Sequence, residues 1–325
     1  MARTNLSEWL LHRQVPPKLA ETMTSVAAAC AEIAEVLRTA PIEGISGVAG
    51  TTNVQGEDQK QLDVVSNDIF IEHLRPNRHV SALVSEELEE PLLFERSADE
   101  GGLAIACDPL DGSSNLDVNV TVGSIFSFLE VPADDPGAHL LQPGTEQIAA
   151  GYAAYGNSTS LVLVYQGQAS AFTLDASGDF VLTAATLTIP SESAEYAINA
   201  ARERFWDEAT RTYVADSVKG EDGPLGKRYN MRWVGSMVAD IHRILMRGGV
   251  FLYPLDSETV AKGGRLRLLY EANPMALIVE AAGGRASTGP GRLLEAAPSS
   301  IHQRIPVILG SSAEVERIER LYQQL

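Results

Sequence analysis

The stretch Asp108-Pro-Leu-Asp-Gly-Ser-Ser114 directly follows the apolar run 103–107. A short apolar run that stops at acidic and turn-forming residues is typical of a buried strand that ends at the edge of a sheet. The stretch therefore predicts that two carboxylates, a glycine and two hydroxyls meet at one strand-to-turn corner. An ordinary polar turn is the alternative, but few turns combine these residue types within so short a span.

Other acids in the chain suggest what this corner does. Glu57, Asp58 and Asp63 precede it, Ser85-Glu86-Glu87 lies between them and the corner, and Glu271 follows much later. Carboxylates without a partner raise one another's pKa unless a cation joins them, and Mg²⁺ or Mn²⁺ prefers such hard oxygen ligands. The Gly-Ser-Ser turn offers N–H and hydroxyl donors to an anion. Together these features indicate metal-assisted hydrolysis of a phosphate ester.

The charge is divided unevenly along the 325 residues, whose net charge is −18. Residues 1–187 contain 8 Lys and Arg against 26 Asp and Glu, whereas residues 188–325 contain 17 of each. Residues 97–201 include no Lys or Arg, which argues against a basic groove for nucleic acid. Solubility is the plainer account of the acidity. The sharper one is that the first half binds cations and the second half supplies arginines to an anionic substrate.

The sequence also limits where the protein works. No apolar stretch reaches membrane-spanning length without a charge or turn residue, and the first residues lack the pattern of a signal peptide. Two cysteines, Cys30 and Cys107, cannot form a disulfide framework. We therefore expect a cytoplasmic protein with no membrane partner and no nucleic-acid partner. None of the six histidines has a metal-ligand spacing, and His242 and His302 are predicted to be structural.

Hydrophobic periodicity predicts a mixed α/β chain with an antiparallel first sheet. Helices are expected over 18–39, 66–74 and 313–325, and another is expected through Met246 with Ser236 as its N-cap. A further helix is expected with Asn273 as its N-cap and Pro274 in its first position. Strands are expected over 120–131, 149–155, 160–165, 169–174, 180–183, 250–253 and 306–309. The charge balance and the strand–helix rhythm change near 187–192. We therefore divide the chain into an N-terminal metal-binding domain, 1–187, and a C-terminal substrate-binding domain, 188–325.

The corner stretch resembles the Asp-Pro-x-Asp-Gly-(Ser/Thr) signature of the Mg²⁺-dependent, Li⁺-sensitive sugar and inositol phosphatases. Longer strings are similar to class 1 fructose-1,6-bisphosphatase, and they lie in that family's order over nearly the whole chain after residue 18. These strings are 53–63, 84–87, 108–115, Val-Gly-Ser-Met-Val-Ala-Asp-Ile-His-Arg at 234–243, Phe-Leu-Tyr-Pro at 251–254 and Leu-Arg-Leu-Leu-Tyr-Glu-Ala-Asn-Pro-Met-Ala at 266–276.

The resemblance implies a layered α-β-α-β-α fold with two subdomains whose mixed sheets are stacked. It implies hydrolysis of the 1-phosphate of fructose 1,6-bisphosphate, in gluconeogenesis or the Calvin cycle. Sedoheptulose 1,7-bisphosphatase or a dual-specificity bisphosphatase is the nearest alternative. An inositol-type monophosphatase would not need the distal-phosphate residues Asn199 and Arg232. A catalytically inactive binding protein on the same fold is a further alternative, which a turnover assay would separate.

The family also implies roles for the acids. Glu86 matches the carboxylate that bridges metals, and Asp108, Asp111 and Glu271 complete a metal site. The Leu110 carbonyl serves another ion, and Glu57 occupies a third position, so two or three Mg²⁺ per subunit are expected, with Mn²⁺ possible. Asp63 and Glu87 match the pair that positions and deprotonates the attacking water. Without the resemblance, Glu87 could equally be a solvated member of the acidic run 86–90.

The substrate residues are carried over in the same way. Asp111, Gly112, Ser113 and Ser114 match the cradle of the reacting 1-phosphate. In the second half the matching positions are Asn199, Arg232, Met237, Tyr253 and Arg265. The family is a homotetramer in which the residue matching Arg232 reaches a neighbouring subunit, and an arginine fork suits a phosphate. A surface arginine on an ordinary loop is the alternative for Arg232.

Several positions depart from the family pattern. Arg202 stands where a polar phosphate ligand is usual, Trp233 replaces a Tyr, and Arg265 replaces a Lys. Arg202 could bind phosphate or point away from it.

The family's AMP site also lacks its residues here. The matching segment 16–21 has no glycine, Gly102-Leu103 replaces a Lys-Tyr pair, and Glu130 replaces an arginine. The sequence therefore predicts that AMP does not inhibit, unless Arg13, Lys18 or Arg38 builds a site elsewhere.

Overall fold

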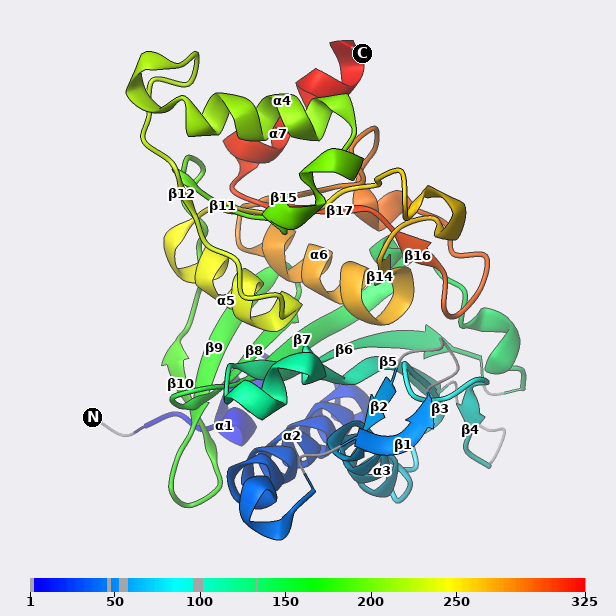
Figure 1. The fold of residues 1–325 in the computed structure, drawn as a ribbon. Coiled ribbons are helices and arrows are strands. Elements are labelled where there is room, and N and C mark those ends of the chain that lie inside the picture. Colours follow the sequence, from blue (N-terminus) through cyan, green and yellow to red (C-terminus); the bar gives the residue numbers. More distant parts are fainter. Residues whose placement is uncertain (1–2, 46–47, 53–57, 96–101, 133, 325) are drawn as a thin grey trace.

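The chain folds into five stacked layers of helices and sheets (Figure 1). The computed structural model describes residues 3–45, 48–52, 58–95, 102–132 and 134–324. Helices α1 (Leu6–His12), α2 (Pro17–Glu43) and α3 (Gln61–Leu74) cover one face of an eight-stranded sheet. Helices α5 (Met237–Arg247) and α6 (Asn273–Ala281) lie between that sheet and a five-stranded one. Helices α4 (Glu208–Val218) and α7 (Ser312–Gln324) cover the other face of the five-stranded sheet, opposite α5 and α6. The expected α-β-α-β-α layering and the α/β class are confirmed.

The large sheet has the order β10-β9-β8-β7-β6-β5-β3-β4. Its strands from β6 to β10 form the predicted antiparallel meander. Strand β5 extends the meander by pairing antiparallel with β6, whereas β3 is parallel to β5, so the sheet is mixed. The bounds are β3 Val80–Ser85, β4 Leu92–Leu93, β5 Gly102–Asp111, β6 Val122–Val131, β7 Gln147–Tyr155, β8 Thr159–Tyr165, β9 Gln168–Leu174 and β10 Phe180–Ala184.

Both faces of this sheet are buried, which explains its long apolar runs. On β6, Phe126 joins the core against α1–α3, whereas its neighbour Ile125 joins the core against α5 and α6. Because successive side chains of a strand alternate between faces, such a strand needs apolar residues at nearly every position. Because both faces of the sheet are covered, the end of β5 lies inside the molecule, between two packed layers.

The small sheet has the order β12-β11-β13-β17-β15. The parallel pairs join β11 (Glu195–Ala197) to β12 (Asn230–Met231) and to β13 (Val250–Tyr253). The antiparallel pairs join β17 (Val307–Gly310) to β13 and to β15 (Arg285–Ser287). Two further pairs stand apart, β1 (Val48–Thr52) with β2 (Asp58–Lys60) and β14 (Leu266–Arg267) with β16 (Arg304–Ile305).

Two helix starts differ from the sequence prediction. Helix α3 begins at Gln61 rather than near Ser66, which brings Asp63 into its first turn. Asn273 is not the N-cap of α6, because a π-helical turn, Leu268–Ala272, precedes it and is continuous with the helix. All five residues of that turn are buried, so tertiary packing rather than a capping side chain decides where the helical segment begins. The predicted Ser236 cap of α5 is confirmed.

Helix α2 is 27 residues long and buries one face against the large sheet. Pro17 stands in its first turn, where a missing N–H costs nothing. No helix in the described ranges is both long enough and apolar enough to cross a membrane.

Candidate metal and phosphate site

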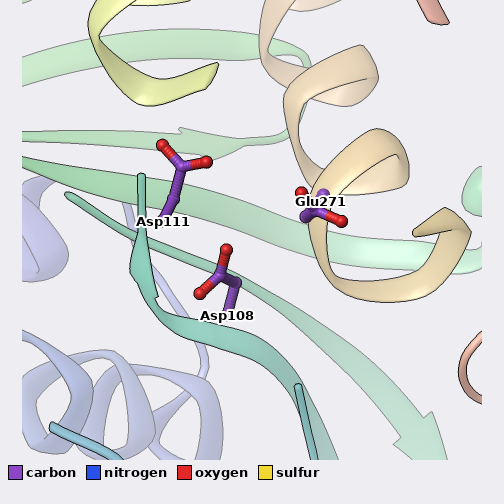
Figure 2. A group of neighbouring side chains, drawn as sticks. All are labelled: Asp108, Asp111 and Glu271. Atoms are coloured by element: carbon purple, nitrogen blue, oxygen red, sulfur yellow. The ribbon is translucent and has the colours of Figure 1, made fainter. Parts of the chain in front are cut away.

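Asp108, Asp111 and Glu271 converge inside the molecule, where the large sheet meets the middle helices (Figure 2). One carboxylate oxygen from each lies within 4.8 Å of the others, and all three residues are buried. The β5–β6 register shifts between Asp108 and Asp111, an irregularity that re-aims side chains at a strand end. Glu271 enters from the π-helical turn before α6. The predicted corner is thus joined by a residue more than 150 positions away.

The cluster carries more negative charge than the protein around it neutralises. Burial, followed by the charge of Glu86, raises the pKa of Asp108 well above its usual value. Burial raises the pKa of Glu271 to about 8 and that of Asp111 to about 6. Arg267 is the cation that contacts Glu271 and Glu86. Three converging carboxylates, with the charge of Glu86 nearby and Arg267 paired to Glu86 and Glu271, fit a divalent cation with hard oxygen ligands.

Asp108→Asn is expected to stabilise the metal-free protein at pH 8 while abolishing activity. Because the folded-state pKa of a buried acid is raised, the acid's contribution to stability is lost as pH rises through that pKa. Asparagine keeps an acceptor for the Leu110 N–H, which donates to Asp108 at 3.0 Å. Thermal unfolding in EDTA should show Tm higher by about 2–5 °C at pH 8, with a smaller difference at pH 5 that vanishes only as pH falls below the ordinary Asp pKa of about 4.

The exposed Asp134→Asn is the matched control and should leave Tm unchanged at both pH values. A lower Tm for Asp108→Asn at pH 8 would contradict the charge argument.

The N-terminus of α5 holds Asp111 in place. The Ser236 hydroxyl donates to Asp111 Oδ2 at 2.7 Å, and the Val238 and Met237 N–H groups donate at 2.9 and 3.3 Å. A helix N-terminus favours a negative charge. Gly112 follows at φ +77°, and a Cβ there would lie 2.5 Å from the Ser236 Cβ. The motif glycine is therefore required both by its backbone conformation and by the close approach of α5.

Arg267 is a site residue that the sequence reasoning missed. Its Nη2 lies 2.6 Å from Glu86 Oε1, its Nη1 lies 3.7 Å from Glu271 Oε2, and its backbone N–H donates to Glu271 at 2.6 Å. The i,i+4 spacing of Arg267 and Glu271 was the available signal. Arg267 joins Glu86, which follows β3, to Glu271, which precedes α6, and so links the two halves of the chain at the cluster.

The candidate water-activating acids lie beside the cluster. The Lys60 N–H donates to Asp63 at 2.8 Å, and the Ser113 hydroxyl also hydrogen-bonds this carboxylate. Burial, with a smaller contribution from the charge of Glu86, raises the pKa of Asp63 to about 6. Glu87 is half-buried, and its N–H donates to the Ser85 hydroxyl at 3.3 Å. Glu57 lies outside the described residues, as does the side chain of Asp58.

The candidate substrate residues come from several elements of the second half. Trp233 stacks on Phe251 at 5.8 Å and meets Tyr253 edge-on at 5.6 Å between ring centroids. The Asn199 side chain accepts from the Ala201 N–H. Met237 is buried in the first turn of α5, whereas Arg232 and Arg265 are exposed.

Asp240 is a second residue that the sequence reasoning missed. It accepts from the Val234 and Gly235 N–H groups at 3.0 and 3.1 Å. It thereby fixes the turn that separates Arg232 from Met237. Burial raises its pKa to about 6.

Arg202 points toward acids of its own half. Its Nε donates to Asp256 at 2.7 Å, its Nη2 lies 2.6 Å from the same carboxylate, and its Nη1 lies 3.1 Å from Glu258. Of the two possibilities left by the sequence, the structure favours the one in which this arginine points away from a phosphate. The pair joins the 200–205 segment to the loop that follows Tyr253.

Comparisons with known proteins agree over the full length. Residues 3–185 match the family model "Fructose-1-6-bisphosphatase, N-terminal domain", and residues 189–323 match the corresponding C-terminal domain. A relative from Halorhodospira halophila (strain DSM 244 / SL1), named fructose-1,6-bisphosphatase class 1, is 49% identical over 333 residues, covering 99% of this chain and 98% of that protein. Two structures of Leishmania major fructose-1,6-bisphosphatase each match 99% of this chain and 100% of their own. The holo form gives 37% identity and a TM-score of 0.93, and the apo form 35% and 0.86.

The five layers and the buried acidic cluster between them define a sugar phosphatase of the α/β class. The chain belongs to the fructose-1,6-bisphosphatase family.

Proposed function

We propose that the chain hydrolyses the 1-phosphate of fructose 1,6-bisphosphate, giving fructose 6-phosphate and inorganic phosphate. The observation that carries the proposal is the buried cluster of Asp108, Asp111 and Glu271, with the Gly112-Ser-Ser turn beside it at the N-terminus of α5. Carboxylates that could bind a cation therefore lie next to N–H and hydroxyl groups that could bind a phosphate. Family membership over the whole chain supports a phosphatase that acts on a sugar bisphosphate.

Glu86, Asp108, Asp111 and Glu271, with the Leu110 carbonyl, would hold Mg²⁺, or Mn²⁺ in its place. We propose two or three ions per subunit, with Glu57 serving the further position. Bound divalent cations supply charge stabilisation to the entering and leaving oxygens of an in-line displacement. The excess of buried carboxylates over arginine supports this assignment.

Glu87 and Asp63 are the proposed acceptors of the water proton. The water oxygen forms a bond to phosphorus, the bond from phosphorus to the C1 oxygen breaks, and that oxygen leaves as the sugar hydroxyl after taking a proton. The raised pKa of Asp63, about 6, lies near the range in which a general base works at neutral pH. Its hydrogen bond with Ser113 ties the proposed base pair to the proposed phosphate cradle.

The substrate is proposed to lie between the two halves of the chain. The reacting phosphate would be held by Asp111, Gly112, Ser113 and Ser114. The sugar and the distal phosphate would be held by residues of the second half of the chain, namely Asn199, Arg232, Met237, Tyr253 and Arg265. We propose a homotetramer in which Arg232 serves a neighbouring subunit, and the exposure of Arg232 in the single chain supports this role.

The domain division at 187/188 remains a proposal, supported by the change of charge balance there. A cytoplasmic location is likewise proposed, and the two buried free cysteines are consistent with it. We propose gluconeogenesis or the Calvin cycle as the pathway.

One assay separates the candidate activities. Phosphate release is measured side by side on fructose 1,6-bisphosphate, sedoheptulose 1,7-bisphosphate and inositol 1-phosphate, with and without Mg²⁺. We expect Mg²⁺-dependent turnover that is fastest on the fructose substrate. Preference for the seven-carbon substrate would support the alternative bisphosphatase, preference for the inositol ester would indicate a monophosphatase, and no turnover on any would indicate a binding protein.

AMP at millimolar concentration is expected to leave activity unchanged. Lys18 Nζ lies 3.6 Å from Glu130 Oε1, so the nearby cation already pairs with the carboxylate that would face an incoming nucleotide phosphate. A like charge at about 4 Å costs on the order of 1 kcal/mol in water and more when shielded from it. Titration of activity with AMP is the measurement, and half-inhibition in the micromolar range would refute the prediction. Glu130→Arg is the informative companion variant, because it restores the family's charge at that position.

A further inference from the structure

His302, which the sequence predicted to be structural, lies next to the segment that carries Glu87. Its Nε2 is 3.0 Å from the Leu88 carbonyl oxygen, and its Nδ1 is 2.8 Å from the Tyr270 hydroxyl. The two rings meet edge-to-face, with centroids 5.8 Å apart and planes at 74°. Tyr270 is fully buried and precedes Glu271 in the chain. His302 therefore links Tyr270, which precedes the cluster acid Glu271, to Leu88, which follows the proposed base Glu87.

The hydrogen bonds determine the tautomer of this ring. A carbonyl oxygen can only accept, so Nε2 must carry the hydrogen. In a neutral imidazole Nδ1 is then an acceptor, and the Tyr270 O–H donates to it. Burial lowers the pKa of His302, which favours this neutral ring at physiological pH. The imidazole thus accepts from the Tyr270 hydroxyl and donates to the Leu88 carbonyl, and it also hydrogen-bonds the backbone of Glu89.

The position of Glu87 is fixed from both sides. On its amino side, Arg267 pairs with Glu86 at 2.6 Å and the Ser85 hydroxyl accepts from the Glu87 N–H. On its carboxyl side, His302 donates to the Leu88 carbonyl. Arg267 and His302 belong to one unit, because β14 carries Arg267 and pairs with β16, and the Leu268 N–H donates to the Gln303 carbonyl at 2.7 Å.

We propose that His302, oriented by Tyr270, is a positioning residue that holds the Glu87 carboxylate in its reactive place through the Leu88 carbonyl. The inference rests on the proposed role of Glu87. A displacement of about 1 Å in a reacting group can cost on the order of 10²-fold in rate. Losing the His302 contact should therefore lower kcat and leave KM for the bisphosphate nearly unchanged, because the substrate contacts lie elsewhere.

Two substitutions at His302 separate positioning from packing. In His302→Gln the amide nitrogen reaches the place of Nε2 and can still donate to the Leu88 carbonyl. In His302→Asn the amide ends near the place of Nδ1 and loses that contact. We expect His302→Asn to lower kcat by about 10- to 100-fold and His302→Gln to stay within about threefold of the wild type, both with KM within about twofold.

A matched pair of tyrosines provides the second arm, in case His302→Asn does not fold. Tyr152 is fully buried and its hydroxyl lies 2.7 Å from His242 Nδ1, the same contact that Tyr270 makes with His302 at a different place in the fold. Tyr270→Phe should lower kcat by about 3- to 10-fold, whereas Tyr152→Phe should change Tm alone.

The wild type is assayed first, in the same phosphate-release assay. If it does not hydrolyse the bisphosphate, the proposed function fails. If it does, and His302→Asn and His302→Gln lose kcat equally, or lose only Tm, or raise KM instead of lowering kcat, the positioning role of His302 is overturned while the function stands. Equal kcat for Tyr270→Phe and Tyr152→Phe would overturn it as well.

Discussion

Glu87→Gln is expected to lower kcat for fructose 1,6-bisphosphate by about 10²- to 10⁴-fold, the usual worth of a general base. The substitution keeps the size and the hydrogen-bonding capacity of the side chain but removes its ability to take a proton from water. Backbone contacts hold this position, through the Ser85 hydroxyl on one side and the Leu88 carbonyl on the other. The fold and the neighbouring acids should therefore be unaffected.

The acidic run itself supplies the control. Glu89 and Glu90 are exposed members of the same run, and Glu89→Gln and Glu90→Gln should keep wild-type kcat. Thermal unfolding with and without Mg²⁺ shows whether Glu87→Gln is folded and still stabilised by the metal. Near-wild-type turnover in a folded, metal-responsive Glu87→Gln protein would remove Glu87 from the mechanism and favour its description as a solvated surface acid.

The pair Asp108 and Asp111 was predictable because its signal is local, whereas the role of Glu271 was implied by the family resemblance. Asp108 and Asp111 stand together after an apolar run, and an apolar run that ends in acids marks a strand end wherever it occurs. The strands from β5 to β10 were predictable for the same reason, since turn residues separate runs of apolar residues that lie on a two-sided sheet. Ser236, as the N-cap of α5, is also a local signal.

The contacts that complete the site had no such signal. His302 meets Leu88 across 214 positions of sequence, and Arg267 meets Glu86 across a similar separation. The local signal for Arg267 is its i,i+4 spacing to Glu271, which an ordinary surface ion pair shares. Nothing within a few residues of His302 distinguishes it from a core histidine. The π-helical turn before Asn273 was also invisible, because Pro274 and Asn273 form a convincing local start, while burial of Leu268–Ala272 extends the helical segment backwards.

The layering depended on both kinds of information. The sequence pattern predicts a mixed α/β chain, whereas the order of the five layers was implied by the family resemblance and is confirmed by the structure. The reason is physical: α5 and α6 are buried on two sides, against strands of both sheets. A periodicity analysis detects one apolar face and does not say which sheet will cover it.

Arg232→Ala is expected to reduce kcat/KM for fructose 1,6-bisphosphate by about 10- to 150-fold, and for fructose 1-phosphate by no more than about threefold. A charge-assisted hydrogen bond to phosphate is worth about 1.5–3 kcal/mol, and fructose 1-phosphate lacks the distal phosphate that would receive it. Arg228, another exposed arginine four positions earlier, is the matched control, and Arg228→Ala should affect neither substrate. Equal losses on both substrates would show that Arg232 acts on the structure of the loop.

The same variant tests whether Arg232 serves its own subunit or a neighbour. In the proposed tetramer, a site with intact Glu87 on an Arg232→Ala subunit would receive its arginine from a Glu87→Gln neighbour. Unfolding and refolding the two variants together should then restore activity at low bisphosphate concentration, to about a quarter of the wild-type value for random pairing of equal amounts. The count follows because half of the pairs are mixed and each mixed pair contains one complete site out of two. Refolding each variant alone controls for recovery, and a mixture no more active than the average of its components would place Arg232 in the site of its own chain.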